Sequence, residues 1–238
     1  MSLIVKICGL STRDALDVAL DAGADMVGFV FFAPSPRNVS FETARALGAR
    51  VEARAKKVAL TVDADDALLA EIVELFGPDF LQLHGDETPE RVLAVKSKFK
   101  LPIIKALPIE KRADFNELKK YALGPDWERT ELHPWTHNWI LFDAKAPKDA
   151  TRPGGLGRPF DWHLVGAALT NVPIILSGGL NPKNIEEALR ITRVPAVDVS
   201  SGVESSPGVK DPNKIREFIR IAREAHVRLP VYEAESNP

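Results

Sequence analysis

The sequence has one cysteine and no long apolar run, and both absences restrict the kind of protein it encodes. A lone cysteine cannot form an internal disulfide, so the chain is not a disulfide-stabilised secreted domain. No stretch approaches the roughly 18 apolar residues that a membrane-spanning helix requires. The N-terminal segment also lacks the basic region and the small-residue cleavage site of a secretory signal. We therefore expect a cytoplasmic protein that does not act on membranes.

An excess of charge of one sign is also missing. The 31 basic and 33 acidic residues give a formal net charge of −2 and are mixed along the chain. Proteins that bind nucleic acids or anionic membranes usually carry a basic patch or stripe, so neither is an expected partner. A chain of 238 residues with 45% hydrophobic and 27% charged residues is typical of a soluble globular protein rather than a disordered or fibrous one. Small molecules are the expected partners.

Eight short apolar or β-branched runs recur along the chain, and segments with helical periodicity lie between them. Dividing 238 residues by eight gives about 30 residues per unit, which is the length of one βα repeat. The pattern predicts an α/β fold, a single-domain (β/α)8 TIM barrel with a closed, parallel, eight-stranded sheet over residues 1–227. The expected strands are residues 3–7, 26–32, 57–62, 80–83, 102–106, 139–142, 173–176 and 196–199.

An open, doubly wound sheet is the alternative fold. That fold usually places a glycine fingerprint after its first strand, and the segment Cys8-Gly9-Leu10-Ser11 is not such a fingerprint. Two segments interrupt the regular alternation. Residues 124–138 form a polar excursion with tryptophan and proline, and residues 228–238 are expected to be a loose C-terminal tail. Nothing resembles a linker between domains.

Capping residues mark several helix boundaries. Ser11 or Thr12 is expected to begin a helix that ends before Gly23, where the chain needs a left-handed residue. A cap residue directly before a proline is a second starting signal, because proline at the first helical position loses no hydrogen bond. That signal occurs at Thr88, Asn181 and Asp211.

Polar residues follow the predicted strands, where a barrel of this kind carries its functional groups. Catalytic side chains project from the C-terminal ends of the strands and from the loops after them. The strand map therefore converts directly into a list of candidate site residues. These are Cys8, Arg37, Asp63, His84, Asp143, Ser177, Ser200 and Ser201.

Glycine is concentrated late in the chain, with eight of the 15 glycines between Gly154 and Gly208. Backbone N–H groups approach an anion closely where no Cβ intervenes, and the loops after strands 7 and 8 commonly bind phosphate in this fold. A phosphorylated substrate is therefore expected, although the same glycines also suit tight βα turns. The predicted phosphate-binding residues are Gly155, Gly157, Gly178, Gly179, Ser201 and Gly202.

Seven sequence blocks, spread between residues 5 and 218, carry a more specific signal. Together they closely resemble the phosphoribosylanthranilate isomerase family, (β/α)8 enzymes of tryptophan biosynthesis, with the blocks in the family's order. Only residues 124–138 and the tail look longer than the family's pattern. The blocks are residues 6–10 (KICGL), 28–37 (GFVF leading into SPR), 81–87 (LQLHGDE), 142–145 (FDAK), 154–162 (GGLG with FDW), 177–182 (SGGLNP) and 197–204 (VDVSSGVE).

The resemblance implies an Amadori rearrangement that needs neither a metal nor an organic cofactor. N-(5′-phosphoribosyl)anthranilate becomes 1-(2-carboxyphenylamino)-1-deoxyribulose 5-phosphate through ring opening and proton abstraction. By match to the family's motifs, Asp143 is the general acid, Cys8 is the general base and Arg37 binds the anthranilate carboxylate. The alternatives without a catalytic role are a loop-capping carboxylate for Asp143, a buried structural thiol for Cys8 and a solvated loop arginine for Arg37.

Three further side-chain sets need interpretation. His84 either lines the aromatic pocket or hydrogen-bonds to the backbone at a strand end. His133 and His137 have a spacing that suits a metal, but Pro134 lies between them and a third ligand is missing, so we expect no metal site. Because successive residues of a strand face opposite sides, the side chains of Lys6 and Asp198 are expected to point into the barrel from neighbouring strands. A buried charge is costly unless it is paired. We therefore predict a buried ion pair.

Two other functions compete with the isomerase. The sugar isomerase of histidine biosynthesis performs the same rearrangement, but its resemblance calls for an aspartate where Cys8 stands. A non-catalytic module that binds a phosphorylated ligand would keep the glycine loops and lose the acid and the base. Cys8 itself argues against the first, and the presence of Cys8, Asp143 and Arg37 together argues against the second. The sequence is compatible with a monomer or a homodimer.

Overall fold

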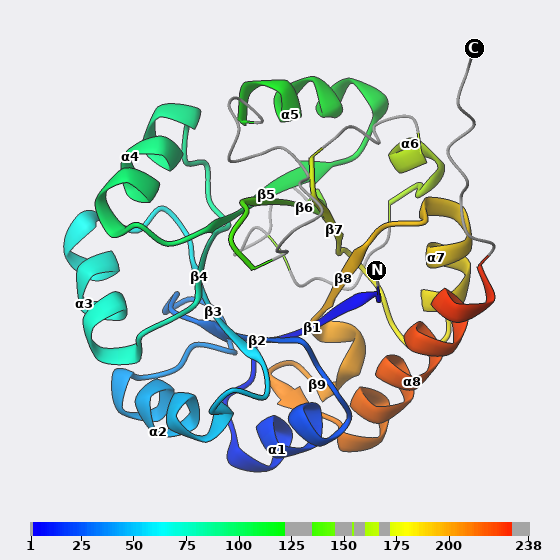
Figure 1. The fold of residues 1–238 in the computed structure, drawn as a ribbon, viewed down its shortest axis with the longest axis horizontal. Helices are drawn as coiled ribbons and strands as arrows, with labels where there is room; N and C mark the ends of the chain where they lie inside the picture. Colours follow the sequence, from blue (N-terminus) through cyan, green and yellow to red (C-terminus); the bar gives the residue numbers. More distant parts are fainter. Residues whose placement is uncertain (1, 122–134, 146–153, 155–159, 167–171, 230–238) are drawn as a thin grey trace.

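The structure, a computed structural model, describes residues 2–121, 135–145, 154, 160–166 and 172–229 (Figure 1). Eight parallel strands form a closed barrel in chain order, with β8 beside β1, and the helices surround them. This confirms the predicted closed barrel and excludes the open doubly wound sheet. The strands are β1 (Ile4–Cys8), β2 (Met26–Val30), β3 (Lys56–Thr61), β4 (Phe80–Leu83), β5 (Ile103–Ile109), β6 (Trp139–Ala144), β7 (Ile174–Leu176) and β8 (Ala196–Val199).

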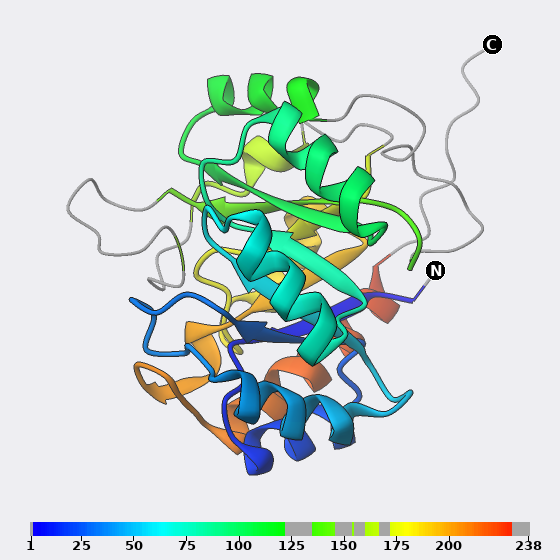
Figure 2. The ribbon, with the colours of Figure 1, turned by 90° about the vertical axis from the view of Figure 1, so that its left-hand side faces the viewer.

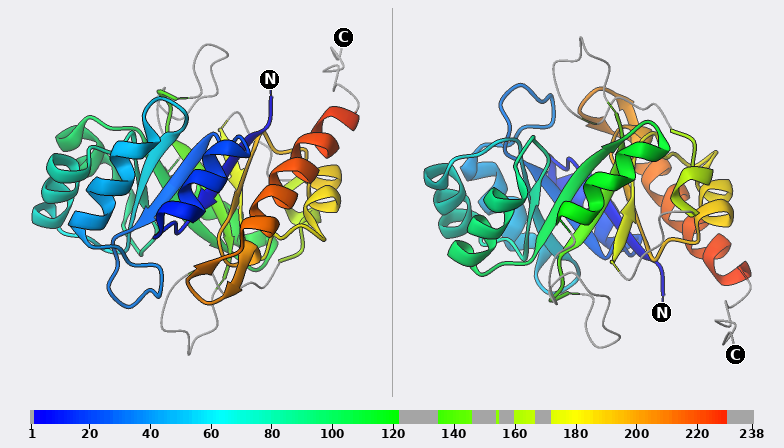
Figure 3. Two further views of the ribbon diagram at one scale, coloured as in Figure 1. Left: turned by 90° about the horizontal axis from the view of Figure 1, so that it is seen from below. Right: turned by 90° about the horizontal axis from the view of Figure 1, so that it is seen from above.

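The helices alternate with the strands. C-terminal α8 packs against both α1 and α7, which closes the outer ring (Figure 3). No helix among the described residues has the length and apolar character to cross a membrane. The helices are α1 (Arg13–Asp21), α2 (Phe41–Val51), α3 (Asp66–Phe76), α4 (Pro89–Phe99), α5 (Phe115–Tyr121), α6 (His163–Gly166), α7 (Ile185–Thr192) and α8 (Pro212–Arg228), with short 3-10 turns η1 (Arg112–Asp114) and η3 (Ser201–Val203).

Most of the predicted helix caps are present. The side chains of Thr12, Thr88 and Asp211 each accept hydrogen bonds from backbone N–H groups in the first turns of α1, α4 and α8. The prediction for Asn181 is wrong, because α7 begins only at Ile185. The Asn181 side chain instead accepts a hydrogen bond from the N–H of residue 183 at 2.9 Å. Asparagine side chains stabilise such turns in competition with helices, so the helix starts later.

Side chains that point into the barrel form a closed apolar layer toward the N-terminal ends of the strands. Because successive strand residues face opposite sides, Lys6 and Cys8 continue the inward face of β1 above this layer. The polar inward residues therefore gather toward the C-terminal ends of the strands. The apolar layer contains Ile4, Met26, Val58, Phe80, Ile104, Ala106, Trp139, Leu141, Ile175 and Ala196, with Trp135 packed against it.

A small antiparallel hairpin of β9 (Glu204–Ser206) and β10 (Val209–Lys210) follows η3 and was not predicted. Figures 2 and 3 show this hairpin projecting from the same end of the barrel as the loop after β2. A Cβ on Gly208 would lie 2.6 Å from the carbonyl oxygen of Pro36, so the two segments are in direct contact. The hairpin therefore forms part of the rim at the C-terminal ends of the strands.

The two segments predicted to be irregular are described only in part. Of residues 124–138, the structure describes 135–138, in which the buried Asn138 side chain accepts hydrogen bonds from the N–H of Ile103 and from Lys96. This end of the excursion is therefore attached to β5 and α4. Helix α8 reaches Arg228, where the loose tail was expected to begin. Residues 122–134 and 230–238 lie outside the described residues.

Candidate active site

A pocket of about 650 Å³, including the part open to solvent, lies at the C-terminal ends of the strands. Residues on or after β1–β4 and β6–β8 line it, so closure of the sheet creates the pocket. Its described lining is Cys8, Val30, Phe32, Ser35, Arg37, Leu60, Val62, His84, Asp143, Gly154, Ser177, Gly178, Gly179, Leu180, Asp198, Val199, Ser200 and Ser201.

Cys8 ends β1 and is 3% exposed, with its side chain in the pocket wall. It pairs in register with Gly28 of β2, where a Cβ would lie 2.8 Å from the sulfur atom. The missing side chain at Gly28 therefore provides the space that the thiol occupies. Burial raises the pKa of the Cys8 thiol above its ordinary value of 9.0, while the positive charges of Lys6 and Lys210 oppose that rise.

Lys6 and Asp198 form the predicted ion pair inside the barrel, with 2.8 Å between Nζ and Oδ1. They are partners in the β1–β8 register, and Ser177 donates a hydrogen bond to the second carboxylate oxygen at 3.2 Å. Burial alone lowers the pKa of Lys6, but the interactions with Asp198 and Cys8 together outweigh it, so this pKa lies above its ordinary value of 10.5. Lys6 is thus a fixed positive charge near Cys8 at neutral pH.

Asp143 stands on β6, and its side chain is fixed by two hydrogen bonds. Its Oδ1 atom accepts from the N–H of Ala144 at 2.9 Å, and its Oδ2 atom lies 3.2 Å from Nε2 of His84. The other ring nitrogen of His84 lies 3.0 Å from the side-chain amide of Gln82. His84 therefore lines the pocket, as one of its two predicted roles required, and also contacts the candidate acid.

Arg37 lies in the pocket wall but is not solvated. Its Nε and Nη2 atoms donate to the two carboxylate oxygens of Glu204 at 2.7 Å and 2.8 Å. This bidentate geometry fixes the plane of the guanidinium group. Lys210 donates to the same carboxylate at 2.7 Å. The arginine is therefore a pre-oriented cation at the pocket rather than a mobile loop residue.

The glycine loops after β7 and β8 lie together at the pocket. Gly178 and Gly179 have φ angles of +82° and +69°, which let the loop turn inward. Within the described residues, the N–H groups of Gly178, Gly179, Ser201 and Gly202 donate no hydrogen bond to the protein. Gly178, Gly179 and Ser201 line the pocket, and Gly202 packs against the Leu180 carbonyl. Gly155 and Gly157 lie outside the described residues.

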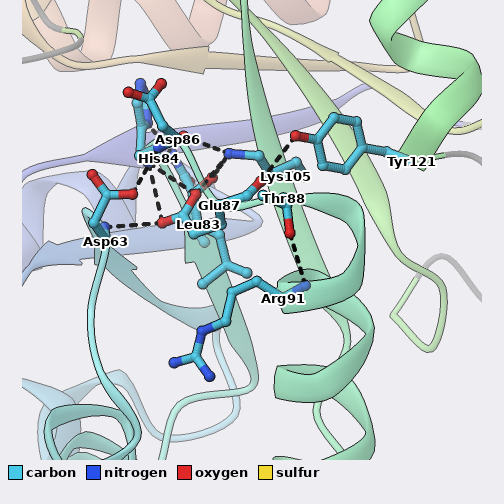
Figure 4. A network of polar contacts seen from close by, with 11 residues as sticks. Asp63, Leu83, His84, Asp86, Glu87, Thr88, Arg91, Lys105 and Tyr121 are labelled. Atoms are coloured by element: carbon cyan, nitrogen blue, oxygen red, sulfur yellow. Dashed lines mark hydrogen bonds and ion pairs between the residues drawn. The ribbon is translucent and has the colours of Figure 1, made fainter.

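The rim after β4 is held by a second buried ion pair, Lys105–Glu87, at 2.7 Å (Figure 4). Lys105 also donates to the Gly85 carbonyl at 2.6 Å, and Glu87 accepts from the N–H groups of Asp63 and Gly85. Tyr121 donates to the Glu87 carbonyl at 2.8 Å. These contacts attach the loop that follows His84 to the neighbouring strands, outside the pocket.

Within the described part of the chain, no group of three or more histidine, cysteine, aspartate or glutamate side chains is placed to hold a metal ion. His137 is described, whereas His133 lies outside the described residues.

Two charged residues of the site, Glu204 and Lys210, were not predicted. Glu204 stands at the end of the block VDVSSGVE, but nothing in its neighbours indicates that its partner is Arg37, which is 167 residues away along the chain. Lys210 precedes the Asp211 helix cap and looks like a surface lysine in the sequence. The buried position of both side chains arises only when the hairpin folds over the barrel rim.

Comparisons with known proteins agree with this arrangement. Residues 5–221 match the family model described as N-(5′-phosphoribosyl)anthranilate isomerase. The isomerase of that name from Bradyrhizobium diazoefficiens is 59% identical over 223 residues, 94% of this chain and 95% of the relative. The Nitrobacter winogradskyi isomerase is 56% identical over 229 residues, with 96% of each chain covered.

Solved structures give the same result. The crystal structure of the phosphoribosylanthranilate isomerase from Thermotoga maritima matches with a TM-score of 0.78 and 32% identity, over 93% of this chain and 99% of that chain. A second isomerase structure contains reduced 1-(o-carboxyphenylamino)-1-deoxyribulose 5-phosphate and matches with a TM-score of 0.76 and 30% identity, over the same shares of the two chains.

Proposed function

This chain belongs to the N-(5′-phosphoribosyl)anthranilate isomerase family, and we propose that Cys8 and Asp143 are the general base and the general acid of its reaction. The enzyme converts an aldose derivative into a ketose derivative by an Amadori rearrangement in tryptophan biosynthesis. The observation that carries the assignment is that the thiol and the carboxyl group line one pocket from well-separated strands, β1 and β6. A sugar bound between them meets an acid on one side and a base on the other.

Asp143 opens the ring. Its carboxyl group donates a proton to the furanose ring oxygen, the bond between that oxygen and C1′ breaks, and a Schiff base forms with the anthranilate nitrogen. The resulting carboxylate is stabilised by hydrogen bonds already in place, from the Ala144 N–H and from His84. In this scheme His84 acts as a positioning residue because it orients the acid.

Cys8 completes the rearrangement. Its thiolate takes the proton from C2′, the electrons move toward the Schiff base, and the enolamine that forms tautomerises to the ketone. Burial raises the pKa of the thiol, so the base requires nearby positive charge, and Lys6 is the inward-facing neighbour on the same strand. The thiolate is the reactive form, and the rate therefore depends on how well that charge compensates burial.

Two anchors hold the substrate's anionic ends. Arg37, oriented by Glu204, binds the anthranilate carboxylate, since a guanidinium group matches a carboxylate geometrically. The N–H groups of Gly178, Gly179, Ser201 and Gly202 bind the phosphate, together with Gly155 and Gly157 of the loop after β6. The N–H groups of Gly178, Gly179, Ser201 and Gly202 donate no hydrogen bond to the described part of the protein, which supports this assignment.

The isomerase with the reduced ligand contains a phosphorylated sugar bearing a carboxyphenylamino group, which supports the same class of small-molecule substrate here. We propose a cytoplasmic enzyme with one catalytic barrel over residues 1–227. The Thermotoga maritima relative is described as dimeric, and this chain acts as a monomer or a homodimer, which sedimentation analysis distinguishes.

The acid and base assignments are tested by the variants Cys8→Ala and Asp143→Asn. Loss of a positioned acid or base lowers turnover by about 10² to 10⁴, and the loss of substrate fluorescence measures it. Asp14→Asn, at an exposed carboxylate on α1, is the control and retains full turnover. If either site variant keeps more than half of the activity, the corresponding assignment is wrong.

A further inference from the structure

Among the residues that the structure describes, five buried charged side chains, each at most 8% exposed, surround the Cys8 end of the pocket. Three are cations and two are anions, so one positive charge is left over when Cys8 is a neutral thiol. The charged or titratable groups of the opposite wall, Asp143 and His84, face each other. The five residues are Lys6 on β1, Arg37 after β2, Asp198 on β8, and Glu204 and Lys210 on the hairpin.

The ion pairs identify which cation is uncompensated. Lys6 has its own partner in Asp198 at 2.8 Å. Arg37 binds both oxygens of Glu204, at 2.7 Å and 2.8 Å. Lys210 shares that carboxylate with the arginine and has no carboxylate of its own within the described residues. The surplus positive charge of the cluster therefore belongs to Lys210.

Lys210 is placed beside the pocket rather than at the surface. Its Nζ atom donates to Glu204 at 2.7 Å, and to the carbonyl and hydroxyl oxygens of Ser200 at 3.0 Å and 3.3 Å. Ser200 itself lines the pocket with Cys8. Three acceptors around one nitrogen match the three N–H bonds of an ammonium group.

Lys210 and Glu204 have the geometry of an ion pair, with 2.7 Å between Nζ and Oε1. Burial lowers the pKa of Lys210 below its ordinary value of 10.5, although the Glu204 carboxylate opposes this. Although burial alone raises the pKa of Glu204, the hydrogen bonds from Arg37 and Lys210 hold it below its ordinary value of 4.5. A carboxylate that remains charged in a buried site requires charged partners. Arg37 is one such partner, and the three acceptors around Nζ of Lys210 fit an ammonium group as the other.

We propose that Lys210 is a positioning residue for the isomerisation, whose uncompensated ammonium charge is neutralised when Cys8 becomes a thiolate. The thiolate then balances a cluster that otherwise carries one positive charge, and this balance offsets the cost of a buried anion. The hairpin is therefore part of the catalytic apparatus although it lies outside the eight βα units. The proposal rests on Cys8 being the general base.

Because the chain has a single cysteine, the ultraviolet absorbance of the thiolate reports on Cys8 alone once the spectrum of Cys8→Ala is subtracted. In Lys210→Met the midpoint of the thiol titration rises by about one pH unit or more, and kcat below that midpoint falls about tenfold with a smaller change in KM. Lys210→Gln keeps a hydrogen-bond donor without the charge and gives the same shift if the methionine variant does not fold. Lys210→Arg restores the midpoint.

A matched control is available in Lys105–Glu87, which has the same 2.7 Å distance and similar burial but lies outside the pocket. Lys105→Met destabilises the protein without moving the thiol midpoint. The double variant Lys210→Met, Glu204→Gln removes one charge of each sign, so the midpoint of the thiol titration returns toward that of the unaltered protein. Additive losses in the double variant would instead indicate a merely structural role.

An unmoved midpoint in both neutral Lys210 variants, or an equal shift in Lys105→Met, overturns the proposal. The titration needs no turnover, so it is independent of the proposed function. An active Cys8→Ala enzyme refutes the general-base role of the thiol, whereas an unmoved midpoint refutes only the role of Lys210.

Discussion

Lys6 and Asp198 face each other at 2.8 Å inside the barrel, at paired positions of the first and last strands. Both side chains are at most 5% exposed. The pair thus lies where the chain closes the sheet on itself, and it shares the inward face of β1 with Cys8. The same contact contributes to barrel closure and to the electrostatics of the pocket.

Lys6→Met is expected to reduce the free energy of unfolding by about 3–5 kcal/mol, because it leaves the Asp198 carboxylate buried without a partner. Denaturant unfolding measures the loss. Lys6→Met combined with Asp198→Leu removes both charges and costs less than the single change. The exposed pair Lys120–Glu117 is the control, and Lys120→Met there has no measurable effect. Equal losses at the two sites would contradict the prediction.

The protein is expected to lose stability in alkali. Burial raises the pKa of Cys8 above 9.0, and the interactions of Lys6 with Asp198 and Cys8 outweigh burial and raise the pKa of Lys6 above 10.5. A group with a raised pKa in the folded state contributes stability below its unfolded pKa and loses it as the pH rises through the folded value. The free energy of unfolding therefore falls above about pH 9, as urea titrations at increasing pH show.

The Cys8→Ala variant separates the two contributions to alkaline instability. Without the thiol, the decline in the free energy of unfolding begins nearer to pH 10.5, the ordinary pKa at which the lysine loses its proton in the unfolded chain. A decline that begins at the same pH in both proteins would mean that Cys8 is not the group responsible.

Gly28→Ala is expected to displace the catalytic sulfur. The new Cβ lies 2.8 Å from Sγ, so the thiol must move, and a misplacement of about 1 Å lowers turnover by as much as about 10²-fold. Gly48→Ala is a matched control, since its Cβ meets the Phe76 ring at the same 2.8 Å, far from the pocket. Both variants lose stability, but only Gly28→Ala loses kcat. Equal kcat values in the two variants would refute this role of Gly28.

Arg37→Lys is expected to raise KM by about 10- to 10²-fold with a smaller change in kcat, because a hydrogen bond to a charged group contributes about 1.5–3 kcal/mol. Lysine cannot reproduce the two-point contact with Glu204 or present a planar fork to the substrate carboxylate. Steady-state kinetics measure the effect, and Arg45→Lys at an exposed position of α2 is the control. A loss confined to kcat would assign Arg37 to the chemistry instead.

Periodicity and spacing were sufficient to predict the barrel and much of the site. All eight strands lie within a few residues of the predicted runs, and β4 and β8 match them fully. Functional side chains of this fold follow the C-terminal ends of the strands, and parallel strands in a closed sheet end on the same side. This predicted that Cys8, His84 and Asp143 lie at one rim. The same alternation argument predicted the Lys6–Asp198 contact. Asn181 was assigned wrongly because a turn and a helix cap share the same local signal.

The sequence by itself therefore determined the order, direction and inward faces of the strands, since these depend on patterns within a few neighbouring residues. Only the tertiary structure decided that Arg37 binds Glu204, that Lys210 lies beside the pocket and that His84 contacts Asp143. These partners lie on different loops and strands, and their side chains meet only after the sheet closes and the hairpin folds over its rim. The charge balance around Cys8 depends on distance in space, which local sequence patterns do not encode.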